Sequence, residues 1–183
     1  MDPRIRLLDL LATRSARRGS FTLASGRQSD LYIDCRPTTM HPEGLATIGP
    51  LGLHAIGELG WRPQSVGGLT LGADPVSYAI AYASQLAGMP LRAFTVRKEA
   101  KTHGTGKVIE GAFETGDHVV VVEDVITTGG SALRAVESVR AAGGTVVGVL
   151  AVVDRGEGGR EALEAAGLEV TALVTAAEIV ARM

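Results

Sequence analysis

The feature that most constrains the fold is a run of four valines at residues 119–122, directly after His118. Four consecutive β-branched residues leave no side of a strand for solvent, so the run favours a strand buried on both faces. Residues 146–153 form a second such run, and a helical pattern over 132–142 lies between the two. Strands that alternate with helices predict an α/β fold, in which a parallel sheet is flanked by helices.

The rest of the chain extends this alternation. Further helices are expected over 43–59, 74–86, 159–166 and 176–182, and further strands over 65–71, 91–96 and 169–174. Asp74 is a candidate N-cap, since Pro75 suits a first helical turn. We expect residues 1–183 to form a single domain, with ligands bound where the parallel strands end.

The first forty residues differ from this pattern. Residues 1–18 mix charged and apolar side chains as an amphipathic helix does, and residues 20–36 are typical of a β-hairpin. We expect this hairpin, here called the hood, to cover one edge of the sheet. Residues 1–40 then form an N-terminal helix and hood attached to the α/β part.

The overall composition argues against several classes of protein. The net charge of −2 provides no general surface for nucleic acid, and no window holds the ~20 apolar residues of a membrane span. The single cysteine, Cys35, cannot form an internal disulfide, which fits a reducing cytoplasm. We interpret Cys35 as a small buried side chain rather than a nucleophile, because no histidine partner is indicated nearby.

Two adjacent carboxylates, Glu123 and Asp124, follow the valine run, and a turn rich in Thr, Gly and Ser comes next. Carboxylates accept hydrogen bonds from sugar hydroxyls, and the free N–H groups at a helix start attract an anion. Glycines let the backbone approach a phosphate closely. The pattern predicts a site for a phosphorylated ribose, formed by the acid pair with Val125, Ile126, Thr127, Thr128, Gly129, Gly130 and Ser131.

Two alternatives to this site are disfavoured: one concerns the same turn, and the other a pair of glycines earlier in the chain. An ordinary strand-to-helix turn with a capping hydroxyl is one of them, but it leaves two carboxylates without a ligand at the end of a buried strand. A Walker loop is the other. Gly111 and Gly116 have its spacing, yet Asp117 occupies the lysine position and a strand follows instead of a helix.

Residues 97–107, here called the basic loop, contain four cations and a histidine. A solvated surface hairpin is one interpretation, since most charged runs face water. The turn at 127–131 contains no cation, however, so a pyrophosphate bound beside it needs neutralisation from elsewhere. A basic loop that closes over the site supplies the charge and excludes water; its candidate residues are Arg97, Lys98, Lys101 and His103.

These motifs resemble those of a known family. Residues 120–131 resemble the signature with which type I phosphoribosyltransferases bind 5-phosphoribosyl pyrophosphate (PRPP): a hydrophobic strand, two acids and a T-T-G-G-S turn. The resemblance implies that Glu123 and Asp124 bind the ribose hydroxyls and that the turn binds the 5′-phosphate. The basic loop is similar to the R-K-x-x-K-x-H-G loop of orotate phosphoribosyltransferases, which implies that Lys101 acts in catalysis together with Asp124. In that family the loop closes over the pyrophosphate of the other subunit of a homodimer.

The hood and one arginine extend the resemblance to orotate phosphoribosyltransferases. Residues 21–34 are similar to the family pattern F-x-L-x-S-G-x-x-S-x-x-Y. Arg155 stands at the family's orotate-binding position, directly after the strand over 146–153, and Thr127 is a second candidate contact for orotate. An ion pair between Arg155 and Asp154 is the alternative interpretation.

The chain departs from the family at a few positions. Ala24 stands where many bacterial members carry a lysine, and residues 72–74 (Gly-Ala-Asp) stand where Tyr-Lys is common. Tyr32 and Ile33 occupy positions that are often aromatic. Two expected contacts to PRPP therefore have no counterpart, and Tyr32 is the one aromatic side chain of this pair.

The resemblance implies an enzyme that joins orotate to PRPP and releases pyrophosphate. Mg²⁺ is expected to be held mainly by PRPP and water, with no direct protein ligand. One alternative is a purine phosphoribosyltransferase of the same fold, which the hood, the basic loop and Arg155 disfavour. Another is a regulator that binds PRPP without turnover. Such regulators usually add a DNA-binding domain or a basic face, and here fewer than twenty residues precede the hood.

Overall fold

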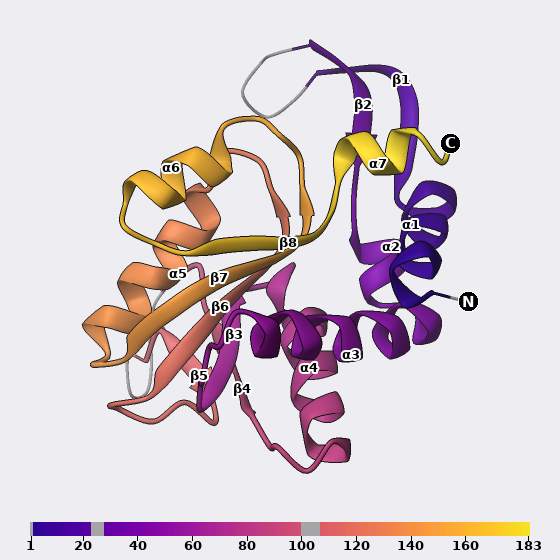
Figure 1. Cartoon of the computed structure of the whole chain (residues 1–183). Coiled ribbons are helices and arrows are strands. Elements are labelled where there is room, and N and C mark those ends of the chain that lie inside the picture. The colour runs from indigo at the N-terminus through magenta and orange to yellow at the C-terminus, as the bar shows by residue number, and fades with distance from the viewer. Residues whose placement is uncertain (1, 23–27, 100–106) are drawn as a thin grey trace.

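A mostly parallel sheet forms the centre of the protein, whose computed structural model describes residues 2–22, 28–99 and 107–183 (Figure 1). In that part of the chain, six strands are joined in the order β5-β4-β3-β6-β7-β8. Their bounds are β3 (Ser65–Leu69), β4 (Arg92–Val96), β5 (Ile109–Gly111), β6 (His118–Ile126), β7 (Thr145–Asp154) and β8 (Val170–Thr175). Neighbouring strands run parallel except β4 and β5. The expected parallel sheet is confirmed.

Helices cover both faces of this sheet (Figure 1). One face packs against α3 (Pro42–Glu58) and α4 (Ala73–Leu86), and the other against α5 (Gly130–Ala141) and α6 (Gly159–Ala165). The valine run serves both layers: Val120 and Val122 belong to the first core cluster, whereas Val119 and Val121 belong to the second. All four are fully buried, as the sequence predicts.

Some element boundaries differ from the expectations. Strand β5 has three residues, which is too short for a hydrophobic period to be read from the sequence. Helix α1 (Pro3–Arg14) ends before the expected limit of 18, and β1 (Ala16–Thr22) begins there. Helix α4 begins at Ala73 with Gly72 as its N-cap, so the assignment of Asp74 as the N-cap is wrong; Asp74 lies inside the first turn.

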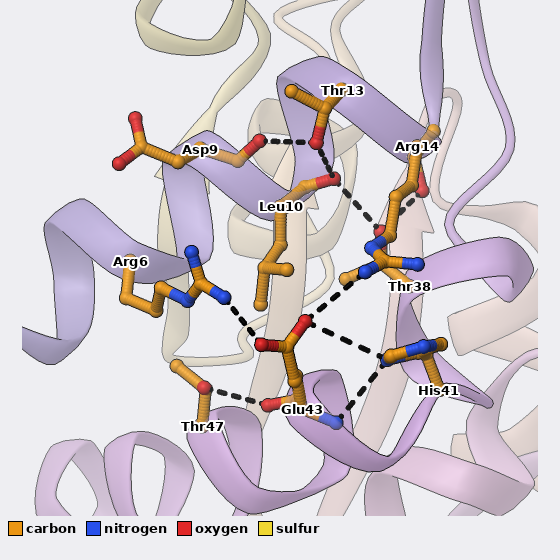
Figure 2. A network of polar contacts seen from close by, with 10 residues as sticks. Arg6, Asp9, Leu10, Thr13, Arg14, Thr38, His41, Glu43 and Thr47 are labelled. Atoms are coloured by element: carbon orange, nitrogen blue, oxygen red, sulfur yellow. Dashed lines mark hydrogen bonds and ion pairs between the residues drawn. The ribbon is translucent and has the colours of Figure 1, made fainter.

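The N-terminal helix is fixed to the α/β part beside α3. Glu43, in the first turn of α3, pairs with Arg6 of α1 at 2.5 Å and with Arg14 at 3.0 Å (Figure 2). The hydrogen bond from Arg6 and the positive charges around it hold the pKa of Glu43 below its usual range. Leu7 and Leu11 of α1 are fully buried in the same cluster as the sheet valines. Short helices α2 (Arg36–Thr39) and α7 (Ala176–Val180) pack against α1 as well.

The hood is a two-stranded antiparallel hairpin, as the sequence predicts. It consists of β1 and β2 (Gln28–Ile33), with Ala16 opposite Ile33 at its base. Both of these residues are buried in the core cluster, so the base of the hairpin is anchored in the body of the protein. The predicted tip, residues 23–27, lies outside the described residues.

Candidate active site

The acid pair lies inside β6 rather than after it. The sequence predicts that this strand ends at residue 122, yet it continues to Ile126, with Glu123 in parallel register with Ala151 of β7. Glu123 is 6% exposed, and its Oε2 has no hydrogen-bond partner among the described residues. Burial raises the pKa of Glu123 to about 9, and the adjacent charge of Asp124 adds to the shift. Burial also raises the pKa of Asp124.

A buried carboxyl group without a partner costs free energy unless a ligand supplies hydrogen-bond donors. The alternative interpretation, an ordinary strand-to-helix turn without a ligand, leaves Oε2 of Glu123 without a hydrogen-bond donor among the described residues. The hydroxyls of a sugar are donors of the required kind, and the cavity lined by Glu123 and Asp124 has room for one. The surroundings of the acid pair therefore favour a ligand site.

The phosphate loop, residues 127–131, joins β6 to α5. Gly129 has φ of +79° and forms the N-cap of α5. An added Cβ there would lie 2.9 Å from the carbonyl oxygen of Gly159, so both conformation and space require glycine. The loop surrounds a small cavity of about 40 Å³ that is lined by residue 123 and residues 125–132. The start of α5 borders this cavity, and the first N–H groups of a helix attract anions.

A larger cavity, of about 290 Å³, connects the acid pair with the hood; we refer to it as the main cavity. It is lined by the end of the hood (32–36), the loop after β3 (69–72), Lys98, residues 123–125, Thr127 and Ser131. The structure thus brings together segments that are far apart in the sequence. Sequence reasoning assigned no role to Asp34 or Arg36. Their signal was two charged side chains directly after a hood strand.

The loop after β3 lies against the acid pair. An added Cβ on Gly72 would lie 2.5 Å from Oδ1 of Asp124, so a larger residue would displace that carboxylate. The loop is held from behind by Asp74, which accepts hydrogen bonds from Thr70 Oγ1 at 2.7 Å and Thr95 Oγ1 at 2.8 Å. Asp74 therefore anchors the loop to β4 through Thr95.

The start of the basic loop reaches the site through Lys98, which lines the main cavity. The carbonyl oxygen of Lys98 accepts a hydrogen bond of 2.8 Å from Nη2 of Arg134 on α5. Arg97 lies 3.7 Å from Glu110 of β5. Lys101 and His103 fall outside the described residues. Of the two predicted residues of this loop that the structure describes, Lys98 lies at the main cavity and Arg97 is not among its lining residues.

Arg155 joins the carboxyl end of β7 to the hood. Its Nη2 donates to the carbonyl oxygen of Leu31 at 2.8 Å and to Ser29 Oγ at 3.3 Å, and its Nε pairs with Glu157 at 2.7 Å. The side chain is 8% exposed. The alternative of an ion pair with Asp154 is wrong, because Asp154 pairs with Arg160 at 3.0 Å.

Cys35 has the environment of a structural residue. It is fully buried, and burial together with the negative charges of Asp124 and Asp34 raises the pKa of its thiol well above the usual value. A nucleophilic cysteine needs the opposite shift. The interpretation of Cys35 as a small buried side chain agrees with these observations.

Comparison with known proteins decides the family. A sequence model described as "Phosphoribosyl transferase domain" matches residues 69–170. The "Orotate phosphoribosyltransferase" of Sorangium cellulosum is 49% identical over 174 residues, which cover 94% of this chain and 90% of the relative. The chain belongs to the orotate phosphoribosyltransferase family. The orotate phosphoribosyltransferase of Rhodopseudomonas palustris is likewise 49% identical, over 96% of this chain and 95% of its own.

Solved orotate phosphoribosyltransferases have the same fold. The Mycobacterium tuberculosis enzyme in complex with Fe(III) dicitrate has a TM-score of 0.86 and 47% identity, over 97% of this chain and 98% of its own. The same enzyme in complex with PRPP has a TM-score of 0.83 and 44% identity, over 97% and 99%. An adenine phosphoribosyltransferase from Leishmania donovani has a TM-score of 0.65 at 19% identity, over 94% and 80%, so it shares the fold alone.

Proposed function

We propose that this orotate phosphoribosyltransferase family member transfers the 5-phosphoribosyl group of PRPP to N1 of orotate. The products are orotidine 5′-phosphate and pyrophosphate, as in de novo pyrimidine biosynthesis. The observation that carries the proposal is the main cavity, in which a buried acid pair and a glycine-rich phosphate loop meet a hood. The protein then works by positioning, charge neutralisation and water exclusion.

Each part of the site has a proposed partner on PRPP. Glu123 and Asp124 accept hydrogen bonds from the ribose hydroxyls, and the phosphate loop with Val125 and Ile126 holds the 5′-phosphate. The cations of the basic loop, Arg97, Lys98, Lys101 and His103, neutralise the pyrophosphate. Lys101 and Asp124 are the proposed catalytic residues.

Orotate is proposed to lie between the hood and the end of β7. Arg155 reaches this region and already holds the hood through the carbonyl oxygen of Leu31. A guanidinium presents several donors in a plane, which suits a carboxylate or ring carbonyls. Thr127, which lines the main cavity, is the second proposed contact for orotate.

The site fits a magnesium ion that is held mainly by the substrate. Among the described residues, no three His, Cys, Asp or Glu side chains are grouped so that they could hold a metal ion. The carboxylate of Asp124 is a hard oxygen donor beside the place proposed for the ribose, and Mg²⁺ keeps several waters or substrate oxygens. The ion would offset the charge of the leaving pyrophosphate.

We propose that the enzyme is a cytoplasmic homodimer with active sites shared between the two subunits. Three apolar side chains of the α4 region are largely exposed: Tyr82 (69%), Leu86 (71%) and Met89 (61%). They line a groove of about 640 Å³ between α3 and α4. An exposed apolar surface of this kind is typical of a subunit interface. No helix in the described ranges is both long and apolar enough to cross a membrane.

The single-domain organisation is also part of this proposal. Residues 1–183 are expected to act as one unit, because α1, the hood base and the sheet contribute to one core cluster.

The decisive experiment is an assay of PRPP-dependent consumption of orotate beside uracil, adenine, hypoxanthine and xanthine, with Mg²⁺ present. Orotate alone should be consumed rapidly, and uracil, which lacks the carboxylate, should be far slower. Turnover of a purine at a comparable rate would indicate the purine-specific alternative. Binding of PRPP without turnover of any base would indicate a regulator.

A further inference from the structure

The main cavity contains a cation that the family motifs do not account for. Arg36 is the last residue of the hood and the first residue of α2, and it lines the cavity together with Lys98 and the acid pair. Its side chain is 51% exposed, so it is accessible to a ligand. The described cavity walls also carry the carboxyl groups of Asp34, Glu123 and Asp124. Arg36 and Lys98 are the two basic side chains among the described lining residues.

The guanidinium of Arg36 is held in a fixed orientation by Asp34. Its Nε donates to Oδ1 of Asp34 at 2.8 Å, and its Nη2 donates to Oδ2 at 2.8 Å. The backbone N–H of Arg36 also donates to Oδ1, at 3.1 Å. This side-on pairing uses two of the five guanidinium N–H groups. The remaining edge, formed by Nη1 and the second N–H of Nη2, keeps the geometry that binds two oxygens of a phosphate.

The position of Arg36 matches one part of PRPP better than the others. The phosphate loop has its own small cavity, lined by residue 123 and residues 125–132, which suits the 5′-phosphate. Arg155 occupies the hood side, where it is bonded to Leu31. Arg36 shares the main cavity with the loop at 69–72, which lies against Asp124. With the small cavity assigned to the 5′-phosphate and the hood side to orotate, the wall that contains Arg36 and residues 69–72 remains for the pyrophosphate.

The need for such a cation follows from the sequence. The phosphate loop has no cation, and residues 69–74, which include the cavity wall after β3, contain none either. The one charged residue of this segment, Asp74, is an acid, and its carboxylate accepts hydrogen bonds from Thr70 and Thr95. It cannot neutralise a pyrophosphate. A pyrophosphate brings several negative charges, and Lys98 is the member of the proposed basic-loop set that lines this cavity among the described residues, so Arg36 adds a second cation there.

We propose that Arg36, oriented by Asp34, binds the pyrophosphate group of PRPP and adds to the positive charge that the basic loop supplies. Arg36 is a substrate-binding residue and Asp34 is a positioning residue. The inference rests on the proposed function, because it assigns Arg36 to the substrate of that reaction. It extends the binding site to a segment outside the recognised motifs.

The test is calorimetric titration with inorganic pyrophosphate in the presence of Mg²⁺, which requires no turnover. Arg36→Ala should weaken pyrophosphate binding about tenfold or more, the usual effect of losing charge-assisted hydrogen bonds. Arg36→Lys should recover part of the affinity, since it keeps the charge but lacks the fork. Asp34→Asn should weaken binding less than Arg36→Ala does. Arg140→Ala, in the last turn of α5 and outside the main cavity, is the matched control for loss of one positive charge.

Steady-state kinetics provide a second measurement. Arg36→Ala should raise KM for PRPP about tenfold, while KM for orotate stays within about twofold of wild type, well below the effect of one lost charge-assisted bond. If pyrophosphate affinity is unchanged in Arg36→Ala, or if KM for orotate rises instead, Arg36 does not bind pyrophosphate. If Arg36→Ala also lowers the melting temperature, the Arg36→Lys variant decides the question. A folded lysine variant with wild-type affinity for pyrophosphate would contradict binding through two guanidinium N–H groups. Failure of the wild-type protein to consume orotate would reject the proposed function, while the pyrophosphate titration would still report on Arg36.

Discussion

At the scale of single residues, the most unusual group is Glu123, a buried carboxyl whose pKa is raised to about 9 mainly by burial. The unfolded chain releases this proton near the ordinary pKa of 4.5, whereas the native protein keeps it. Stability should therefore fall as the pH rises from about 4.5 towards 9. The proposed contact of this carboxyl with the ribose hydroxyls is the function that would offset this cost in stability.

Glu123→Gln should remove that pH dependence. The amide stays neutral, so the variant should be more stable than wild type by about 2 kcal/mol or more at pH 8, and close to wild type at pH 4.5. Urea unfolding at both pH values measures the difference. Glu137→Gln, on the exposed side of α5, is the control and should leave the pH dependence as it is. Parallel pH profiles for Glu123→Gln and wild type would contradict the assignment of a raised pKa.

Asp124→Asn should weaken PRPP binding by about tenfold without unfolding the protein. The carboxylate lies beside Gly72 and accepts the backbone N–H of Val125 at 2.9 Å, a bond that the amide oxygen can still accept. What is lost is the charge and an acceptor for the ligand. Calorimetric titration of PRPP, with circular dichroism as the check on folding, tests this. Unchanged binding and turnover would return the acid pair to a purely structural role.

Arg155→Ala should raise KM for orotate about tenfold or more, and KM for PRPP much less. The reason is the proposed contact between the guanidinium and orotate. The structure adds a second effect, because the carbonyl oxygen of Leu31 also loses its donor. Arg160→Ala, which removes the neighbouring pair with Asp154, controls for loss of an arginine at this edge. Equal increases in both Michaelis constants would indicate that Arg155 acts only through the hood.

At the scale of helices and strands, elements with a long apolar pattern could be predicted from the sequence. Elements that are short or contain polar residues could not. The valine run identified β6, and the helical patterns after residue 42 identified α3, α4 and α5. The end of β6 was misplaced because Glu123 and Asp124 look like loop residues, although backbone pairing with β7 continues through them. Three-residue β5 carries no readable period. The motifs located the acid pair and phosphate loop, but Arg36 required tertiary structure, since only folding brings α2 to β6.

A polar cluster fastens β3, β4 and β6 at the edge opposite to the site. Asp117 is 5% exposed, accepts a hydrogen bond from Ser65 Oγ at 2.9 Å and pairs with Arg92. Asp117→Ala should lower the free energy of unfolding by about 3 kcal/mol, because buried donors lose their acceptor. Glu114 is the other partner of Arg92, and its side chain is 72% exposed. Glu114→Ala should therefore have a far smaller effect on the free energy of unfolding. Denaturant midpoints measure both; similar losses would contradict the importance of burial.

At the scale of the whole molecule, the prediction is that two chains build each active site. Lys101→Ala and Asp124→Asn should each be defective alone, because Lys101 is expected to act on PRPP bound by the other subunit. Unfolded together and refolded, they should form heterodimers in which one site combines both lesions and the other has neither. Activity per heterodimer should return to about half of wild type, since one of two equivalent sites is intact. Sedimentation must first show a dimer. Heterodimers without regained activity would mean that each basic loop serves its own chain.

The joint between Arg155 and the hood has a consequence for how such sequences diverge. Arg155 holds the hood mainly through the carbonyl oxygen of Leu31, an atom that every amino acid provides. Substitutions at the exposed positions of β2 can therefore accumulate without removing this bond. Related chains can vary these side chains, which belong to the wall proposed to face orotate, and keep the same attachment of the hood to β7.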